Sequence, residues 1–157
     1  MVLVAIQAVQ SPNHYVRLDG EGVSSFTDTG GGTVNTQAFI GTYETFTLVI
    51  NDDETVSFKS IFFDNVFLRL DGTGVTAGRK SLAGGGTVNA QYTDRALERF
   101  KIHRKNDPAG ILYQGIVGIE SAAFPGRYLR LDGNKVNVQG VFKDYEEFKI
   151  LVVGKSK

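Results

Sequence analysis

The sequence predicts an all-β protein built from three copies of one unit. The phrase aromatic–Val/Leu–Arg–Leu–Asp–Gly occurs three times in 157 residues, at 15–20, 67–72 and 128–133. Three copies in a short chain indicate one supersecondary unit that is used three times around a shared core. Each copy continues with Val-Asn-x-Gln, at 34–37, 88–91 and 136–139, and closes with Glu-x-Phe, at 44–46, 98–100 and 146–148.

Hydrophobic alternation predicts four strands in each repeat. Apolar residues recur at every second position, which is typical of strands whose alternate side chains face a core. No segment shows helical spacing over a useful length, and 19 glycines suit a turn-rich β protein. In the first repeat the inward positions are expected to be Val4, Ile6, Ala8, Val16, Leu18, Val34, Phe46 and Leu48.

Twelve short strands in three equal lobes predict a closed barrel with a hairpin cap, the β-trefoil, because closure removes exposed sheet edges. We expect a single domain over 1–157, with repeats at about 2–50, 54–104 and 115–153. A chain of this length buries a core without disulfides or metals. Cysteine is absent, which excludes a disulfide framework and a cysteine-ligated metal.

The repeated phrases resemble those of a known group of trefoils. Residues 126–133, together with 146–150, resemble the fascin-like and hisactophilin-like trefoils, in which an aromatic–Leu strand, an Asp/Gly turn, a Val strand and a Glu-x-Phe strand form each lobe. The segment 121–130 is similar to arabinose-binding trefoil modules, and more loosely to trefoil lectins. The resemblance implies the trefoil fold, with sugar binding or actin binding as its functions.

Charge and hydropathy limit the partners. The 17 basic and 17 acidic residues cancel, so we expect no nucleic acid ligand. No apolar run approaches the roughly 20 residues of a membrane-spanning helix, so we expect no membrane insertion. The apolar start lacks a basic segment and alternates like a strand, so we expect no signal peptide and a cytoplasmic protein.

The repeated polar residues form the candidate binding site. One hypothesis is three related sugar pockets, in which Asp accepts from hydroxyl groups, Arg or Asn donates, and an aromatic face stacks on the sugar ring. The candidate residues are Tyr15, Arg17, Asp19, Asn35 and Gln37 in the first repeat, Phe67, Arg69, Asp71, Asn89 and Gln91 in the second, and Tyr128, Arg130, Asp132, Asn137 and Gln139 in the third.

A structural interpretation of the same residues stays open beside this hypothesis. Asp-Gly is a turn-forming pair, and Arg on one strand beside Glu on another, such as Arg17 with Glu44, forms a cross-strand pair. Asn and Gln can hold loop backbone in place. Further aromatic residues that differ between the repeats are either packing residues or stacking platforms; they are Phe26, Phe39, Tyr43, Tyr92, Phe142 and Tyr145.

The repeats differ most after the Asp-Gly turn. Two long segments, 21–33 and 73–87, end in Gly-Gly-Gly-Thr, whereas the third repeat has only Asn134 and Lys135 at this place. A hairpin needs about two to five loop residues. The long segments are therefore flexible hairpin tips, strand extensions or ligand loops. Gly-Lys-Ser/Thr does not follow the glycines, so we expect no phosphate site.

Neither catalysis nor a cofactor is expected. His14 and His103 occupy different positions in their repeats, so they predict no metal site and no catalytic triad. The expected function is therefore binding. We expect a carbohydrate-binding protein whose partners are glycans or glycoconjugates. The alternatives are an actin-binding cytoskeletal module and, third, a protease inhibitor that inserts one of the long loops.

Overall fold

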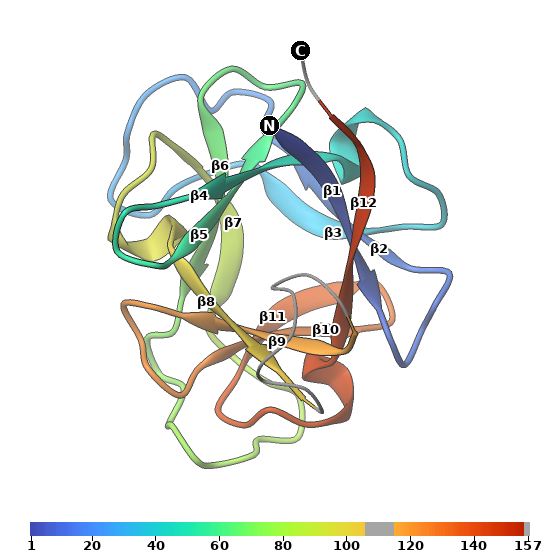
Figure 1. Cartoon of the computed structure of the whole chain (residues 1–157). Coiled ribbons are helices and arrows are strands. Elements are labelled where there is room, and N and C mark those ends of the chain that lie inside the picture. The colour runs from blue at the N-terminus through green and yellow to red at the C-terminus, as the bar shows by residue number, and fades with distance from the viewer. Residues whose placement is uncertain (106–114, 156–157) are drawn as a thin grey trace.

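The computed structural model describes residues 1–105 and 115–155, and within them it shows twelve strands (Figure 1). Three short 3-10 turns, η1, η2 and η3, cover Thr42–Glu44, Ala96–Glu98 and Asp144–Glu146. The strands are β1 Val2–Ala8, β2 Tyr15–Asp19, β3 Thr33–Gln37, β4 Phe46–Ile50, β5 Val56–Ser60, β6 Val66–Asp71, β7 Thr87–Tyr92, β8 Phe100–Arg104, β9 Val117–Ser121, β10 Tyr128–Asp132, β11 Lys135–Gln139 and β12 Phe148–Lys155.

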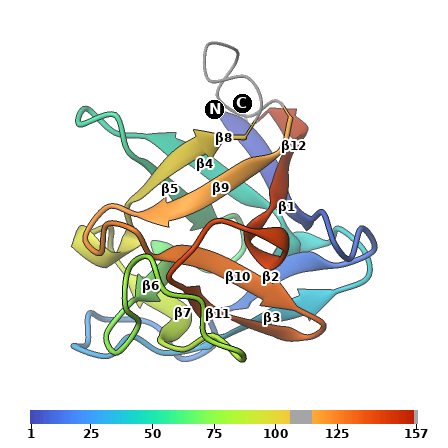
Figure 2. The ribbon, with the colours of Figure 1, turned by 90° about the horizontal axis from the view of Figure 1, so that it is seen from below.

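Six strands form a closed barrel. They pair antiparallel in the ring β1–β4–β5–β8–β9–β12, and β12 returns to β1. The other six strands form three hairpins, β2–β3, β6–β7 and β10–β11, which gather at one end of the barrel (Figure 2). This arrangement is a β-trefoil, and it confirms the predicted all-β fold with its twelve strands.

The core contains the residues that the alternation points to. Val4, Ile6, Val16 and Leu18 are fully buried, as are their equivalents in the other repeats. Burial of each large side chain contributes roughly 1.5–3 kcal/mol. Four buried phenylalanines, Phe46, Phe58, Phe100 and Phe148, are the largest side chains of this core.

A buried glutamate closes each 3-10 turn. The Glu98 carboxylate accepts the backbone N–H of Arg95 at 2.8 Å, and Glu44 and Glu146 make the same bond to the residue three positions before them. Burial raises the pKa of Glu98 and of Glu146, and the accepted N–H groups partly offset this rise. The predicted Arg17–Glu44 pair is present, with 3.9 Å between Nε and Oε2, but Glu44 lies in the turn and not on a strand.

Each long loop packs on the hairpin of the following repeat. Gly31, in the loop after β2, exchanges two backbone hydrogen bonds of 2.8 Å with Ala90 on β7. Gly85, in the loop after β6, exchanges the same two bonds with Val138 on β11. Figure 1 shows the first loop, in blue, beside β6 and β7. The two loops are therefore bound segments, and their interpretation as flexible hairpin tips is wrong.

The third repeat has no such loop. Strands β10 and β11 are joined by the two residues Gly133 and Asn134, which do not extend across the hairpin of the first repeat. The Asn134 Oδ1 atom accepts hydrogen bonds from the Thr36 backbone N–H (3.3 Å) and the Thr36 hydroxyl (2.8 Å). The β2–β3 hairpin is thus the one hairpin without a covering loop among the described residues.

No helix in residues 1–105 and 115–155 is long and apolar enough to cross a membrane.

Candidate functional site

Arg, Asn and Asp of the repeated phrase come together on every hairpin. In each repeat the Arg Nη1 donates to the Oδ1 of the Asn on the paired strand, at 3.3 Å for Arg17, 3.2 Å for Arg69 and 3.1 Å for Arg130. The Arg Nη2 lies 3.0–3.7 Å from the carboxylate of the Asp two residues later. The structure thus brings together three of the five candidate residues of each repeat, and their accessibility decides what they can bind.

In the second repeat the loop 21–32 covers this polar group. The Gln91 side chain donates to the Thr27 carbonyl at 2.7 Å and accepts the Thr27 N–H at 3.3 Å. The Asn89 Nδ2 donates to the Thr29 carbonyl at 2.9 Å, and the Arg69 Nη2 donates to the Asp28 carbonyl at 3.1 Å. Arg69 and Gln91 are buried as a result.

In the third repeat the loop 73–86 makes the equivalent contacts. The Gln139 side chain donates to the Ser81 carbonyl at 2.8 Å and accepts the Ser81 N–H at 3.0 Å. The Asn137 Nδ2 donates to the Ala83 carbonyl at 2.9 Å. In these two repeats Asn and Gln hold loop backbone in place, as the structural interpretation predicted.

The triple glycine allows this close packing. Gly30 and Gly84 both have φ of +67°, a conformation that L side chains rarely adopt. A Cβ atom on Gly84 would lie 2.7 Å from the Asn137 Oδ1, and one on Gly30 would lie 2.8 Å from the Arg69 Cδ. The glycines thus permit contact with the protein's own Arg and Asn side chains.

The polar group of the first repeat is left open. The Arg17 side chain is 23% exposed, against 3% for Arg69 and 3% for Arg130. Within residues 1–105 and 115–155, the Gln37 side chain and the Asn35 Nδ2 have no hydrogen bond partner, although their equivalents bind loop backbone. Their hydrogen-bonding capacity is free for a molecule from outside.

A cleft of about 350 Å³ lies beside these open groups, and we call it the Arg17 cleft. The Arg17 guanidinium lies 5.0 Å from the centre of the Tyr43 ring. The Tyr43 ring in turn packs against Phe62 at 5.5 Å between ring centres. Phe39 and Phe62 are 60% and 59% exposed. The lining consists of Arg17, Gln37, Phe39, Gly41, Thr42, Tyr43, Glu44 and Phe62.

The two exposed aromatic residues are specific to this cleft. The positions equivalent to Phe39 hold Thr93 and Val141. Those equivalent to Phe62 hold Gln10 and Ala123. Because the same fold accepts polar and smaller residues at both positions, it does not require aromatic rings there.

Smaller clefts occur at the equivalent places in the other repeats. The cleft of the second repeat has about 200 Å³, and Phe26 from the covering loop lies 3.9 Å above the Arg95 guanidinium at its edge. The cleft of the third repeat has about 250 Å³ and is lined by Lys80 and Leu82 from its covering loop. Side chains of the covering loops thus line these two clefts, whereas no covering loop contributes to the Arg17 cleft.

The aromatic residue that begins the repeated phrase does not face these clefts. Tyr15, Phe67 and Tyr128 line none of the three. The Tyr128 ring stacks on Phe142, with 5.4 Å between ring centres, and burial together with the nearby Glu120 raises its pKa. The aromatic faces come instead from the segment after β3 and the loop after β5. The sequence had indicated Phe39 and Tyr43 as possible platforms but missed Phe62, whose signal is its divergence between repeats.

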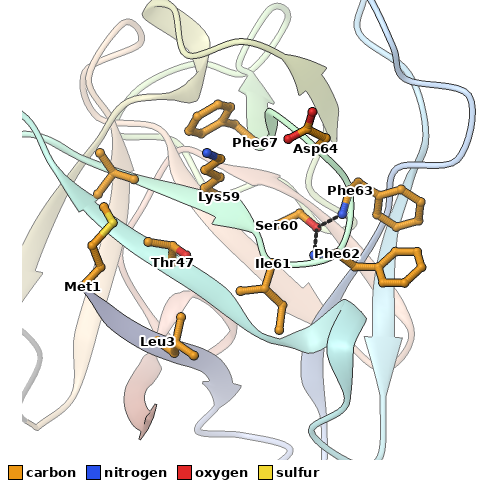
Figure 3. Close-up of a pocket in the computed structure, with 11 residues that line it drawn as sticks. Met1, Leu3, Thr47, Lys59, Ser60, Ile61, Phe62, Phe63, Asp64 and Phe67 are labelled. Atoms are coloured by element: carbon orange, nitrogen blue, oxygen red, sulfur yellow. Dashed lines mark hydrogen bonds between the residues drawn. The ribbon is translucent and has the colours of Figure 1, made fainter. Parts of the chain in front are cut away.

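Phe67 lines a separate hollow of about 580 Å³ on the outside of β1, β4 and β5. Figure 3 shows Met1, Leu3 and Lys59 around this hollow, with the rings of Phe62 and Phe63 turned away from it. The Ser60 hydroxyl accepts the backbone N–H groups of both phenylalanines, at 3.1 and 2.9 Å, and so turns this loop. Phe62, in this loop, lines both the hollow and the Arg17 cleft.

Two of the three Asp residues of the phrase, Asp19 and Asp71, stabilise their turns. The Asp71 Oδ1 accepts the Thr73 N–H at 3.0 Å and the Thr73 hydroxyl at 2.6 Å, and these bonds lower the pKa of Asp71. The Asp19 Oδ1 accepts the Glu21 N–H at 3.0 Å. These are turn contacts of the kind that Asp-Gly predicts, and none of Asp19, Asp71 and Asp132 lines a cleft.

Comparison with known proteins supports the fold. No family model matches the chain, and no curated protein matches it. The designed three-fold symmetric protein ThreeFoil has a TM-score of 0.70 at 12% identity, over 96% of this chain and 99% of that one. SeviL, solved bound to the asialo-GM1 saccharide, has a TM-score of 0.67 at 8% identity, over 98% and 99%.

A third similar structure belongs to a much longer protein. A mosquitocidal holotoxin has a TM-score of 0.70 at 12% identity; the match covers 97% of this chain but 17% of the holotoxin. The chain therefore corresponds to a small part of the holotoxin. At these identities the three likenesses show a shared fold.

Proposed function

We propose that this protein binds carbohydrate non-catalytically, through the Arg17 cleft. The observation that carries the proposal is that Arg17 and Gln37 stay open beside exposed aromatic rings, while the equivalent groups of the other two repeats are covered by loops.

The chemistry of the Arg17 cleft suits a sugar. Sugar hydroxyls need donors and acceptors in fixed directions, and the Gln37 amide supplies both. Arg17 adds charged donors, and the Glu44 Oε2 is an acceptor that Arg17 already contacts at 3.9 Å. Phe39, Tyr43 and Phe62 offer faces on which the C–H side of a sugar ring can pack. Pockets of 300–1,000 Å³ are typical for small ligands, and the cleft has about 350 Å³.

The proposal narrows the expected three sites to one. Arg69 and Arg130 are buried beneath loops, and their neighbours Gln91 and Gln139 already bind loop backbone. With one open site among residues 1–105 and 115–155, multivalent binding through this cleft would come from association of several chains.

The saccharide bound by SeviL supports the proposal at the level of the fold, because that protein shares the architecture over nearly its whole length. Fold alone does not specify function, and the residues of the Arg17 cleft supply the specific support. No observation favours actin binding. Both loops that a protease inhibitor would insert are hydrogen-bonded within the molecule, at Gly31 and Gly85.

A glycan array with three variants tests the proposal. Phe39→Thr and Phe62→Ala place in the cleft the residues that other repeats carry at these positions, Thr93 and Ala123, so the fold should tolerate them. We expect the wild-type protein to bind a defined glycan and free sugar to compete for binding. Phe39→Thr and Phe62→Ala should each weaken binding by about tenfold, which corresponds to about 1.4 kcal/mol.

Tyr145→Leu is the matched control, because it alters the cleft of the third repeat and copies Leu97 of the second. It should leave glycan binding unchanged. A blank array at high protein concentration would refute the proposal, and so would binding that is insensitive to Phe39→Thr and Phe62→Ala.

A further inference from the structure

Two of the three equivalent hairpin surfaces bind a loop segment in the same way. Each segment contains a turn, in which the Gly30 N–H donates to the Thr27 carbonyl at 3.3 Å and the Gly84 N–H donates to the Ser81 carbonyl at 3.5 Å. On the β6–β7 hairpin the segment is residues 26–33, and on the β10–β11 hairpin it is residues 80–87. Both segments end in Gly-Gly-Gly-Thr. Two segments of the chain itself thus show which kind of peptide this surface binds.

The recognition uses three consecutive residues of the hairpin. Gln pairs with both the N–H and the carbonyl of a Thr or Ser, which is Thr27 in one loop and Ser81 in the other. Asn donates to the carbonyl two residues later, in Thr29 or Ala83. The residue between Asn and Gln exchanges two backbone hydrogen bonds with the glycine four residues after the Thr or Ser, as a short β-bridge.

The first repeat presents the same three residues, Asn35, Thr36 and Gln37, without a peptide. The equivalent Ala90 forms a bridge with Gly31, whereas no described loop segment forms such a bridge with Thr36. The Thr36 N–H is held by the Asn134 side chain, at 3.3 Å, in the place of a peptide carbonyl. We call Asn35, Thr36 and Gln37 the template, because they match the residues that bind a loop in the other repeats. The turn 133–134 occupies part of it.

We propose that this surface of the first repeat binds a segment of a partner protein with the pattern aromatic–Thr/Ser–x–small–Gly–Gly–Gly, folded into the same turn as residues 27–30 and 81–84. The main-chain contacts resemble the addition of a strand to a sheet edge, in which backbone bonds give affinity and pockets for side chains give specificity. Glycine at the fifth position is required because a Cβ there would meet the Asn and Arg side chains, as at Gly30 and Gly84.

The cleft beside the template determines the first residue of the pattern. In the second repeat Phe26, which precedes Thr27, lines the equivalent cleft and stacks on Arg95. By the same geometry the first residue of a partner peptide enters the Arg17 cleft, whose walls include Phe39 and Tyr43. An aromatic side chain fits these walls and the Arg17 guanidinium.

This inference goes beyond carbohydrate binding and does not depend on it. Peptide and sugar would share Arg17 and Gln37, so each would exclude the other. A peptide titration therefore tests the surface without any sugar present, and a failed glycan array would leave its result unaffected.

The test is a titration of isotope-labelled protein with the peptide Phe-Thr-Asp-Thr-Gly-Gly-Gly-Thr, residues 26–33 as a free peptide, followed by backbone NMR. We expect shifts confined to the first repeat, centred on Thr36 and Gln37, and saturable binding. The control is the same peptide with Gly30→Ala, which should bind at least about fivefold more weakly because the Cβ forces the ligand off the template.

Two protein variants sharpen the result. Gln37→Ala should weaken the peptide at least about fivefold, because it removes the paired donor and acceptor. Asn134→Gly should strengthen it, because it frees the Thr36 N–H. No shift at millimolar peptide, equal binding of the Gly30→Ala peptide, or shifts only at Ala90 and Val138 would overturn the proposal; the last pattern would mean that the peptide had displaced the protein's own loops.

Discussion

Single replacements of the equivalent residues Gln37, Gln91 and Gln139 by alanine should differ in their effect on the free energy of unfolding. The effect should be large where the side chain binds a loop and small where it does not. Gln139 makes two hydrogen bonds to Ser81, at 3.0 and 2.8 Å, and accepts the Gly140 N–H at 3.1 Å. At about 0.5–1.5 kcal/mol for each bond, and with the Ser81 groups left unpaired, Gln139→Ala should lower the free energy of unfolding by about 2–3 kcal/mol. Gln91→Ala should cost a similar amount, because Gln91 makes the same pair of bonds to Thr27.

Gln37→Ala is the matched comparison, since the Gln37 side chain has no hydrogen bond to another described residue. It should change the free energy of unfolding by less than about 0.5 kcal/mol, as an ordinary surface substitution does. Urea unfolding measures these differences, and thermal unfolding should show Tm lowered by about 4–12 °C for Gln91→Ala and Gln139→Ala only. Equal losses for all three variants would refute the idea that the first repeat is open.

Three further predictions follow from the loops and the buried glutamates. Gly84→Ala should destabilise the protein by at least about 2 kcal/mol in urea unfolding, because the Cβ would meet Asn137; Gly74→Ala, with positive φ but free space around it, should cost only about 1–2 kcal/mol. The raised pKa of Glu146 means that its contribution to stability is fully present below the ordinary value of 4.5 and is lost as pH rises through the folded value. Between pH 4 and pH 7 the free energy of unfolding should therefore fall less steeply in Glu146→Gln than in the wild-type protein. Replacing the turn 133–134 by the segment 73–86 should close the first repeat, so that binding to the Arg17 cleft is lost while the far-ultraviolet circular dichroism spectrum is kept.

Most of the fold could be predicted from the sequence, because local alternation and repetition determine it. Val16 and Leu18 alternate with Arg17, and each recurs in the other two phrases, so strands, faces and three-fold organisation can be inferred from residues close together in the chain. The position of Glu44 was harder. A Glu two residues before a buried Phe is compatible with a strand or with the 3-10 turn that the structure shows, since both bring it near Arg17.

The candidate site could be predicted only in part. The Arg–Asn–Asp grouping follows from strand pairing. The burial of Arg69 and Gln91 does not, because it comes from a loop 41–64 positions earlier in the sequence. Such contacts leave no local pattern. A weak signal was present in the glycine triplets, which occur after the first and second phrases and are missing after the third.

The missing third loop is the feature on which the functional argument depends. In a fully symmetric protein a third loop would cover Arg17, Asn35 and Gln37. It would form hydrogen bonds like those that Asn89 and Gln91 make to loop backbone, and these would add stability. The chain instead has the turn 133–134, keeps the full polar set beneath the absent loop, and adds the exposed Phe39 and Phe62 beside it. The open Gln37 side chain binds water when no ligand is present, so it adds little to stability. Exposed aromatic rings reduce solubility. Among the described residues, open polar groups and exposed aromatic rings coincide at the uncovered first repeat, and this coincidence is the reason for proposing a binding site there.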